Sequence, residues 1–257
     1  MRPRWCVKKR RDRSSLCPWV TDRCAPRRSL GYTAFVHEHQ TLLSALAGKL
    51  VVFEGPDGSG KTTQFSRFSE LCAKGGLGVT EVREPGGTGI GEAIRNLLLA
   101  HDHGDMTLRC EMLLYMASRA QLVEQTIRPA LAQNHLVLAD RYVTSTIAYQ
   151  GAGGGLPEDE ILDVARAATG GLEPDMVVIF DVDESTASCR RSAEPDRIEA
   201  RPGDFRDRVR RGYLEQAKRW PDNHLVIDAM CDADGVFDRL ISGLTERFCP
   251  KARKTGS

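Results

Sequence analysis

Short apolar runs alternate with longer amphipathic segments from Lys49 onward. Apolar, β-branched runs that predict strands occupy residues 49–55, 78–87, 135–142, 174–183 and 224–229. Helical periodicity is found at residues 61–76, 89–100, 108–134, 157–171, 204–220 and 233–248, and residues 185–200 begin as a helix before the pattern loosens. Strands that alternate with helices predict an α/β fold with a five-stranded parallel sheet flanked by helices.

Residues 1–48 lack this pattern. They carry ten Lys and Arg residues against three Asp and Glu, and a short helix is expected only at residues 38–50. The apolar core of a secretory signal is missing from them. We interpret this segment as a basic, disordered extension, with a functional basic arm or an organelle transit peptide as alternatives. The predicted globular domain covers residues 49–247, and residues 248–257 form a tail.

Charge and cysteine content limit the classes of function. The whole chain has a formal net charge of +1, but the part beyond residue 48 has a net charge of −6, which argues against a general nucleic-acid-binding surface. Eight cysteines without a C-x-x-C pair indicate reduced thiols, and hence a cytoplasmic protein. No apolar run reaches the roughly 18 residues that a membrane span requires.

The first predicted strand leads directly into the sequence EGPDGSGKTT. A G-x-x-x-x-G-K-[ST] spacing, followed by Thr63, is formed by Gly55, Pro56, Asp57, Gly58, Ser59, Gly60, Lys61 and Thr62. Glycines in such a loop let backbone N–H groups face phosphate oxygens, and the helix that follows adds a partial positive charge. Lys61 is expected to reach the β- and γ-phosphates, and the Thr62 hydroxyl to join a Mg²⁺ shell.

Two polar clusters end the next two predicted strands. REPGG lies at residues 83–87, and DRY at 140–142 is followed by TSTIAYQG. Because ligands of open α/β sheets gather at the carboxyl ends of the strands, both clusters should face the phosphate loop across one crevice. There Asp140 can serve Mg²⁺, directly or through water, and Arg141 can grip a phosphate. A surface ion pair is the alternative interpretation of Asp140 and Arg141.

A fourth cluster, RRSAEPDRIEARPGDF, covers residues 190–205. Its arginines lie between two helical segments, and Pro195 and Pro202 interrupt any continuous helix. A solvated charged loop is one interpretation. The other is a short arginine-rich lid over the triphosphate, since phosphoryl transfer requires charge compensation and exclusion of water.

Taken in order, the motifs FEGPDGSGKTT, REPGG, EMLLYMASRAQLVE, DRYVTSTIAYQG and DRIE resemble those of bacterial thymidylate kinases. The resemblance extends from about Lys49 to about Ala229. It implies a P-loop nucleoside-monophosphate-kinase fold and transfer of the γ-phosphoryl group of ATP to dTMP, giving dTDP and ADP, with Mg²⁺. It also implies a homodimer formed through core helices, and small-molecule substrates rather than nucleic acid or membrane partners.

Individual residues of the acceptor site also follow from the resemblance. Arg95 and Arg141 match the clamps on the dTMP phosphate, and Asp57 matches a residue near the acceptor sugar and phosphates. Tyr149 matches a tyrosine whose ring crowds a ribose 2′-OH. The candidate catalytic residues outside the lid are therefore Asp57, Lys61 and Arg141.

The resemblance places five residues around the thymine base. Tyr115 occupies a position where the family stacks an aromatic ring, usually Phe, and Arg119 matches a donor to the base O4. Thr146 and Gln150 match positions that bind the base edge, and Pro85 matches the wall of the 5-methyl pocket.

Tyr115 and Arg119 also have a structural interpretation. They lie four residues apart, so they share one helix face. Tyr115 would then be a core residue, and Arg119 would pair with Glu111 or Glu124.

The lid is implied to supply the catalytic arginine. Some family members carry an arginine in the P-loop where this chain has Gly58, and members with glycine there resemble this chain in carrying catalytic arginines in the lid. Arg190 and Arg191 are candidates on the ATP side, and Arg197, in DRIE, is the best matched. Glu199 is a candidate to position metal or sugar.

Two other classes of function remain as alternatives. A deoxynucleoside kinase shares the phosphate loop and the Asp-Arg element, but it accepts a hydroxyl and needs a carboxylate base. Arg95 and Arg141 favour an acceptor that already carries a phosphate. A GTPase-like switch or a non-catalytic nucleotide-binding module predicts a guanine motif such as N-K-x-D, which the sequence lacks.

Overall fold

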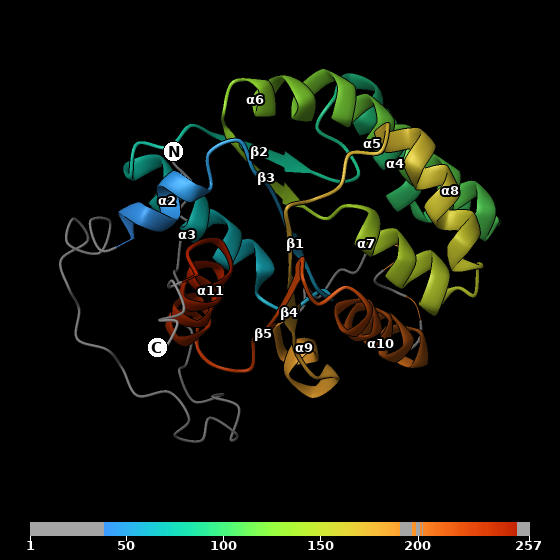
Figure 1. The fold of residues 1–257 in the computed structure, drawn as a ribbon. Helices are drawn as coiled ribbons and strands as arrows, with labels where there is room; N and C mark the ends of the chain where they lie inside the picture. Colours follow the sequence, from blue (N-terminus) through green and yellow to red (C-terminus); the bar gives the residue numbers. More distant parts are fainter. Residues whose placement is uncertain (1–38, 191–196, 199–200, 202, 251–257) are drawn as a thin grey trace, which may run out of the picture.

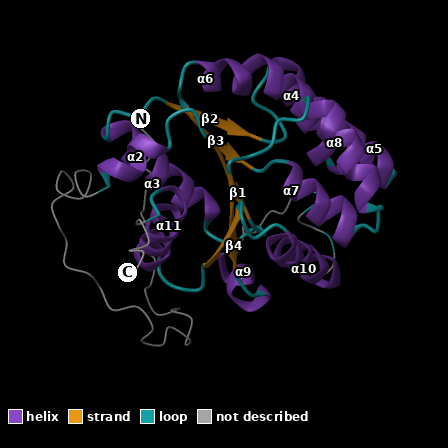
Figure 2. Ribbon diagram, viewed as in Figure 1, coloured by secondary structure: helices purple, strands orange, loops and turns teal. Residues whose placement is uncertain are grey.

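The computed structural model describes residues 39–190, 197–198, 201 and 203–250. Its five strands are β1 (Leu50–Glu54), β2 (Val79–Arg83), β3 (Leu136–Asp140), β4 (Met176–Asp181) and β5 (His224–Asp228). They form one sheet in the order β2-β3-β1-β4-β5, in which every pair is parallel (Figures 1 and 2). The predicted five-stranded parallel sheet is therefore confirmed.

Helices cover both faces of this sheet (Figure 2). They are α2 (Gln40–Ala45), α3 (Lys61–Lys74), α4 (Gly89–Leu99), η1 (His101–His103), α5 (Leu108–Leu122), η2 (Val123–Ile127), α6 (Arg128–Ala132), α7 (Val143–Thr146), η3 (Ile147–Gly153), α8 (Glu158–Thr169), α9 (Glu184–Arg190), α10 (Gly203–Arg219) and α11 (Ala233–Phe248). Each predicted helix has a counterpart among them.

Side chains of β1 alternate between two apolar cores. Val51 and Phe53 pack on the face covered by α2, α3 and α11, while Leu50 and Val52 pack on the face covered by η2, η3 and α10. All five residues of β1 are buried, which explains why the strand is apolar without alternation. A third cluster joins α5, η3 and α8 on the outer side of the second face (Figure 1).

Helix α2 belongs to the first core. Leu42, Leu43 and Leu46 are each at most 1% exposed and pack with residues of α3 and α11. Packed structure therefore begins before Lys49, where we placed the start of the globular domain. The remainder of the proposed extension, residues 1–38, and residues 251–257 of the tail lie outside the described part of the chain.

The predicted helix at residues 108–134 is present but is not regular. A π-helical segment, η2, separates α5 from α6, and Pro129 follows it in the first turn of α6. Proline has no N–H to donate, and its ring clashes with the carbonyl four residues earlier. The wider π turn accommodates the proline without breaking the helix.

The helix formed by α7 and η3 was not predicted as such. Residues 150–155 have the sequence QGAGGG, whose glycines disfavour a helix. Packing explains why it forms: a Cβ on Gly153 would lie 2.7 Å from a ring carbon of Phe205, and a Cβ on Gly212 would lie 2.6 Å from the Cβ of Ala152. Glycines on both elements thus allow η3 and α10 to approach closely, and this tertiary contact outweighs the local propensity.

None of the described helices is long and apolar enough to cross a membrane. The five cysteines in the described part of the chain are thiols that form no disulfide, and Cys72 is buried in the first core.

Candidate active site

The loop between β1 and α3 has the geometry of a phosphate cradle. Gly55, Gly58 and Gly60 all have positive φ angles, of 144°, 87° and 81°. A Cβ on Gly55 would lie 2.7 Å from the carbonyl oxygen of Phe180, and one on Gly58 would lie 2.4 Å from that of Ala187. Only glycine fits these two positions, and the loop delivers the chain to the N-terminus of α3 at Lys61.

Several groups of the loop fit a nucleotide phosphate and its metal. Apart from Gly60 and its two neighbours in the chain, no described atom lies within 4 Å of a Cβ built on Gly60, so space is open there. The Ser59 hydroxyl oxygen is buried and has no hydrogen-bond partner among the described residues. Thr62 and Asp140 both line a cavity beside this loop, which is described below. They offer a hydroxyl and a carboxylate, which are oxygen ligands that Mg²⁺ accepts beside phosphate oxygens and water.

Lys61 is buried at the mouth of this loop and forms an ion pair with Asp140. Burial and the nearby charge of Arg141 lower the pKa of Lys61, and the Asp140 carboxylate partly offsets them. The pairing brings the phosphate loop and the end of β3 together, as the sequence predicted. It also gives Lys61 a charged partner that a bound phosphate group can replace.

Arg141 lies at the turn that leaves β3. Its backbone has φ 73°, which is unusual for a residue other than glycine. The guanidinium donates to Asp57 Oδ1 at 2.6 Å, to Ser145 Oγ at 3.1 Å and to the Tyr213 hydroxyl at 3.0 Å. Three partners on different elements therefore fix the direction of its side chain, which lines the cavity.

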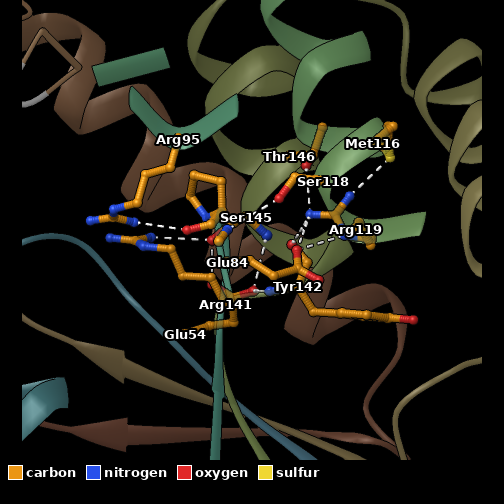
Figure 3. Close-up of polar contacts among 12 residues, drawn as sticks. Glu54, Glu84, Arg95, Met116, Ser118, Arg119, Arg141, Tyr142, Ser145 and Thr146 are labelled. Atoms are coloured by element: carbon orange, nitrogen blue, oxygen red, sulfur yellow. Dashed lines mark hydrogen bonds and ion pairs between the residues drawn. The ribbon is translucent and has the colours of Figure 1, made fainter. Parts of the chain in front are cut away.

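Glu54 is a site residue that the sequence reasoning missed. It is fully buried at the end of β1 and accepts hydrogen bonds from the backbone N–H groups of Tyr142 and Ser145, at 2.9 and 3.1 Å, and from the Ser145 hydroxyl at 2.6 Å (Figure 3). The Tyr213 hydroxyl also donates to Glu54, at 3.0 Å. Burial raises the pKa of Glu54, and the positive charge of Arg141 opposes this shift. Because both hydroxyls also contact Arg141, Glu54 holds the turn that carries this arginine.

Arg119 is almost fully buried beneath the cavity and pairs with Glu84, with Nη2 and Nε at 2.6 and 2.7 Å from Oε2. Its Nη2 also donates to the Tyr142 carbonyl at 3.0 Å and to Thr146 Oγ1 at 3.2 Å (Figure 3). The alternative interpretation, in which Arg119 pairs with Glu111 or Glu124, is therefore wrong. Glu111 shares helix α5 with Arg119 and Glu124 lies in η2, which follows it, whereas Glu84 directly follows β2.

Glu84 was not among the predicted site residues. Burial raises its pKa to about 7, which the charge of Arg119 only partly offsets. One of its carboxylate oxygens is buried without a hydrogen-bond partner among the described residues. The sequence REPGG contains this residue, so its position at a strand end was the available signal.

A cavity of about 200 Å³ opens beside these groups. Predicted residues that line it are Asp57, Lys61, Thr62, Pro85, Arg95, Tyr115, Asp140, Arg141, Thr146, Tyr149 and Gln150, and they are joined by Arg83, Glu84, Leu99, Ser145 and Ile198. Arg119 is not part of the lining and reaches the cavity through Thr146. The structure thus brings together nearly all the residues that we expected around the acceptor.

Tyr149 and Arg95 lie on different walls of the cavity. Tyr149, in η3, donates a hydrogen bond of 3.3 Å to Asp57 Oδ2, and its ring lies 5.1 Å from the Arg141 guanidinium carbon. Arg95, in α4, donates to the Pro85 carbonyl at 3.0 Å (Figure 3). The peptide bond between Glu84 and Pro85 is cis.

The lid arginines in the described part of the chain have separate partners. Arg197 pairs with Glu111 at 2.7 Å and donates to the Leu98 carbonyl at 2.9 Å. Arg190 donates to the Ala229 carbonyl at 2.8 Å, near the start of the segment that links β5 to α11. Two further candidates, Arg191 and Glu199, lie outside the described residues.

The position of the phosphate loop explains why these groups meet. It follows β1, the central strand, and the chain turns to one side of β1 for β2 and β3 and to the other side for β4 and β5. The carboxyl ends of strands at such a switch point form the ligand crevice of open α/β sheets. Fold and site together define a P-loop nucleotide-binding protein.

Comparison with known proteins makes the assignment specific. A sequence model of the thymidylate kinase family matches residues 53–239, and the chain belongs to this family. A thymidylate kinase of an Exiguobacterium species is 42% identical over 205 residues, which cover 79% of this chain and 97% of the relative. A thymidylate kinase of Paraburkholderia xenovorans is 45% identical over 188 residues, covering 71% and 90% of the two chains.

A solved structure agrees with this assignment. The crystal structure of thymidylate kinase from Ehrlichia chaffeensis matches with a TM-score of 0.65 at 32% identity, over 77% of this chain and 99% of that one. The resemblance inferred from the motifs and the P-loop fold are therefore confirmed.

Proposed function

We propose that this chain transfers the γ-phosphoryl group of ATP to dTMP, giving dTDP and ADP, with Mg²⁺. The observation that carries the proposal is the single cavity that joins Lys61 of the phosphate loop to two arginines, Arg95 and Arg141. A lysine beside the cradle suits the donor phosphates, and two guanidinium groups suit an acceptor that already carries a phosphate.

Positioning and charge compensation can carry this reaction. The attacking group is a phosphate oxygen of the acceptor, which is a competent nucleophile, so no general base is required. Arg141 and Arg95 would hold that phosphate, and Lys61 would balance charge on the transferred group. Bound Mg²⁺ would supply further charge neutralisation at the donor phosphates, with Thr62 and Asp140 as the residues placed to hold it.

The base would lie between Tyr115 and Pro85, which both line the cavity. Thr146 and Gln150 line it as well and offer polar groups to the base edge. Arg119 would act at the same edge, either directly or through the Thr146 hydroxyl that it contacts.

A steady-state comparison of dTMP with thymidine as acceptors distinguishes this proposal from the alternative of a deoxynucleoside kinase. We expect kcat/KM for dTMP to exceed that for thymidine by at least 10³-fold, because thymidine leaves Arg95 and Arg141 without a phosphate. Comparable values for the two acceptors would contradict the proposal.

Tyr149 is the residue that we propose discriminates between deoxyribose and ribose in the acceptor. We expect Tyr149→Ala to weaken dTMP binding and to reduce the preference for dTMP over ribothymidine monophosphate by at least tenfold. The Tyr149 ring is held by Asp57 and by edge-to-face contacts with Phe205 and Tyr213, so it forms a fixed wall that a 2′-OH would meet. The ratio of kcat/KM for the two nucleotides measures this effect, and Tyr149→Phe is the matched control. An unchanged ratio in the alanine variant would remove Tyr149 as the sugar gate.

Arg197 is the lid residue that we propose acts in the transition state. We expect Arg197→Ala to lower kcat by roughly 10²-fold, with a smaller change in dTMP affinity, since an arginine that acts in the transition state affects turnover most. Arg201→Ala is the matched control, because Arg201 shares the Glu111 carboxylate with Arg197. Equal losses of kcat in both variants would mean that the Glu111 pairing, and not transition-state charge, is what matters.

Assembly and location complete the proposal. We infer that the protein is cytoplasmic and forms a homodimer. The dimer is supported by large apolar side chains that are exposed on α4 and α5, namely Ile90, Leu97 and Leu113. Light scattering after size-exclusion chromatography tests the dimer. ATP and dTMP are the proposed small-molecule partners.

A further inference from the structure

Glu111 is a buried carboxylate that the mechanism above does not use. It lies in the first turn of α5 and has no exposed surface. Arg197 Nη2 lies 2.7 Å from its Oε2, and Arg201 Nη2 lies 2.9 and 2.7 Å from its two oxygens. A further partner among the described residues is the side-chain amide of Gln150, whose Nε2 donates to Oε1 at 2.8 Å.

This last contact fixes the direction of the Gln150 amide. A carboxylate between two guanidinium groups can only accept hydrogen bonds, so Gln150 must present its NH₂ group to Glu111. Gln150 is 1% exposed and lines the cavity, and its amide oxygen has no partner among the described residues. The amide therefore offers an acceptor, and not a donor, to a molecule in the cavity.

Thr146 presents the complementary hydrogen-bonding group to the cavity, a donor. Arg119 has only donors, so the Thr146 oxygen accepts from it, and the hydroxyl hydrogen has no acceptor in the described part of the chain. The cavity wall thus carries a free donor at Thr146 and a free acceptor at Gln150. The two residues are four apart on one helical segment, so they face the same side.

We propose that Glu111 is a positioning residue that selects the base by fixing the Gln150 amide with its oxygen toward the cavity. The base that fits has a ring N–H and an adjacent carbonyl oxygen, as thymine and uracil do at N3 and O4. Cytosine has the opposite polarity, with a ring acceptor at N3 and an amino donor at C4. The inference rests on the proposed function, since it deepens the account of the same acceptor site.

The test compares two substrate ratios in wild type and Glu111→Gln. A glutamine at position 111 can donate as well as accept, so the Gln150 amide becomes free to turn over. We expect the ratio of kcat/KM for dTMP over dCMP to fall by at least tenfold. The ratio for dTMP over dUMP is expected to stay within twofold, because thymine and uracil share the same edge.

These ratios separate positioning from other consequences of the substitution. Loss of the Arg197 and Arg201 pairing alters phosphate chemistry that is common to all acceptors, so it cancels in each ratio. Arg201→Ala is the matched control: it disturbs the same carboxylate but leaves Gln150 in contact with it, so its dTMP to dCMP ratio should equal that of wild type. A thermal unfolding measurement establishes that the variants are folded.

A second variant keeps the inference testable if Glu111→Gln does not fold. Gln150→Met removes the acceptor itself, and we expect it to reduce the dTMP to dCMP ratio by at least tenfold as well. Adding Glu111→Gln to Gln150→Met should then change that ratio no further. A wild-type ratio in folded Glu111→Gln, or in Gln150→Met, overturns the inference. Absence of dTMP phosphorylation in the wild-type enzyme would instead overturn the proposed function.

Discussion

Replacing Lys61 with alanine is expected to lower kcat for the reaction of ATP with dTMP by about 10³-fold or more. Lys61 is 8% exposed, begins α3 directly after the glycine cradle and pairs with Asp140. Its positive charge lies where negative charge would build up on the transferred group. No other described lysine lines the cavity, so the charge is not replaced from nearby.

The measurement is steady-state ADP release, with thermal unfolding to establish that the variant is folded. Lys74→Ala is the matched control, because Lys74 lies at the other end of the same helix and is half exposed. It should keep the wild-type kcat. A folded Lys61→Ala enzyme with near-normal turnover would show that the loop is not the donor site.

Replacing Arg141 with alanine is expected to lower kcat/KM for dTMP by about 10³-fold. Its guanidinium is held in place by Asp57, Ser145 and Tyr213, so the site does not need to order it when the acceptor binds. Arg141→Lys should recover little of the loss, since lysine keeps the charge but not the planar fork that contacts phosphate at two points.

Arg210→Ala provides the matched control for this prediction. Arg210 forms a two-point pair with Asp181, at 2.6 and 2.8 Å, and it does not line the cavity. Loss of that pair should leave kcat/KM for dTMP within a few fold of wild type. If Arg141→Ala and Arg210→Ala had equal effects, Arg141 would be a structural residue and not a phosphate clamp.

Much of the fold could be predicted because β1 and its neighbours have a strong local signal. Leu50, Val51, Val52 and Phe53 form an apolar run that ends at the glycine loop, and this pattern is typical of a strand buried on both faces. The helix of α7 and η3 could not be predicted in the same way. Gly153, for example, is explained by its contact with Phe205 of α10, which lies far away in sequence.

The candidate site was predictable where its residues belong to loops with a known chemistry, as Lys61 and Arg141 do. Three buried carboxylates were not recognised as site residues: Glu54, Glu84 and Glu111. In the sequence, each of them only lies at the end of a strand or within a helix. Its role in the site depends on hydrogen-bond partners that other elements supply. Glu54 and Tyr213, for example, are 159 residues apart.

Identification of the products of one reaction tests the central claim most directly. The wild-type protein is incubated with ATP, Mg²⁺ and dTMP, and the nucleotides are then separated and quantified by chromatography with mass detection. We predict equal amounts of ADP and dTDP, neither of which should form at a comparable rate when dTMP is omitted or replaced by thymidine. Formation of ADP without dTDP, or equal phosphorylation of thymidine, would contradict the assignment of dTMP as the acceptor.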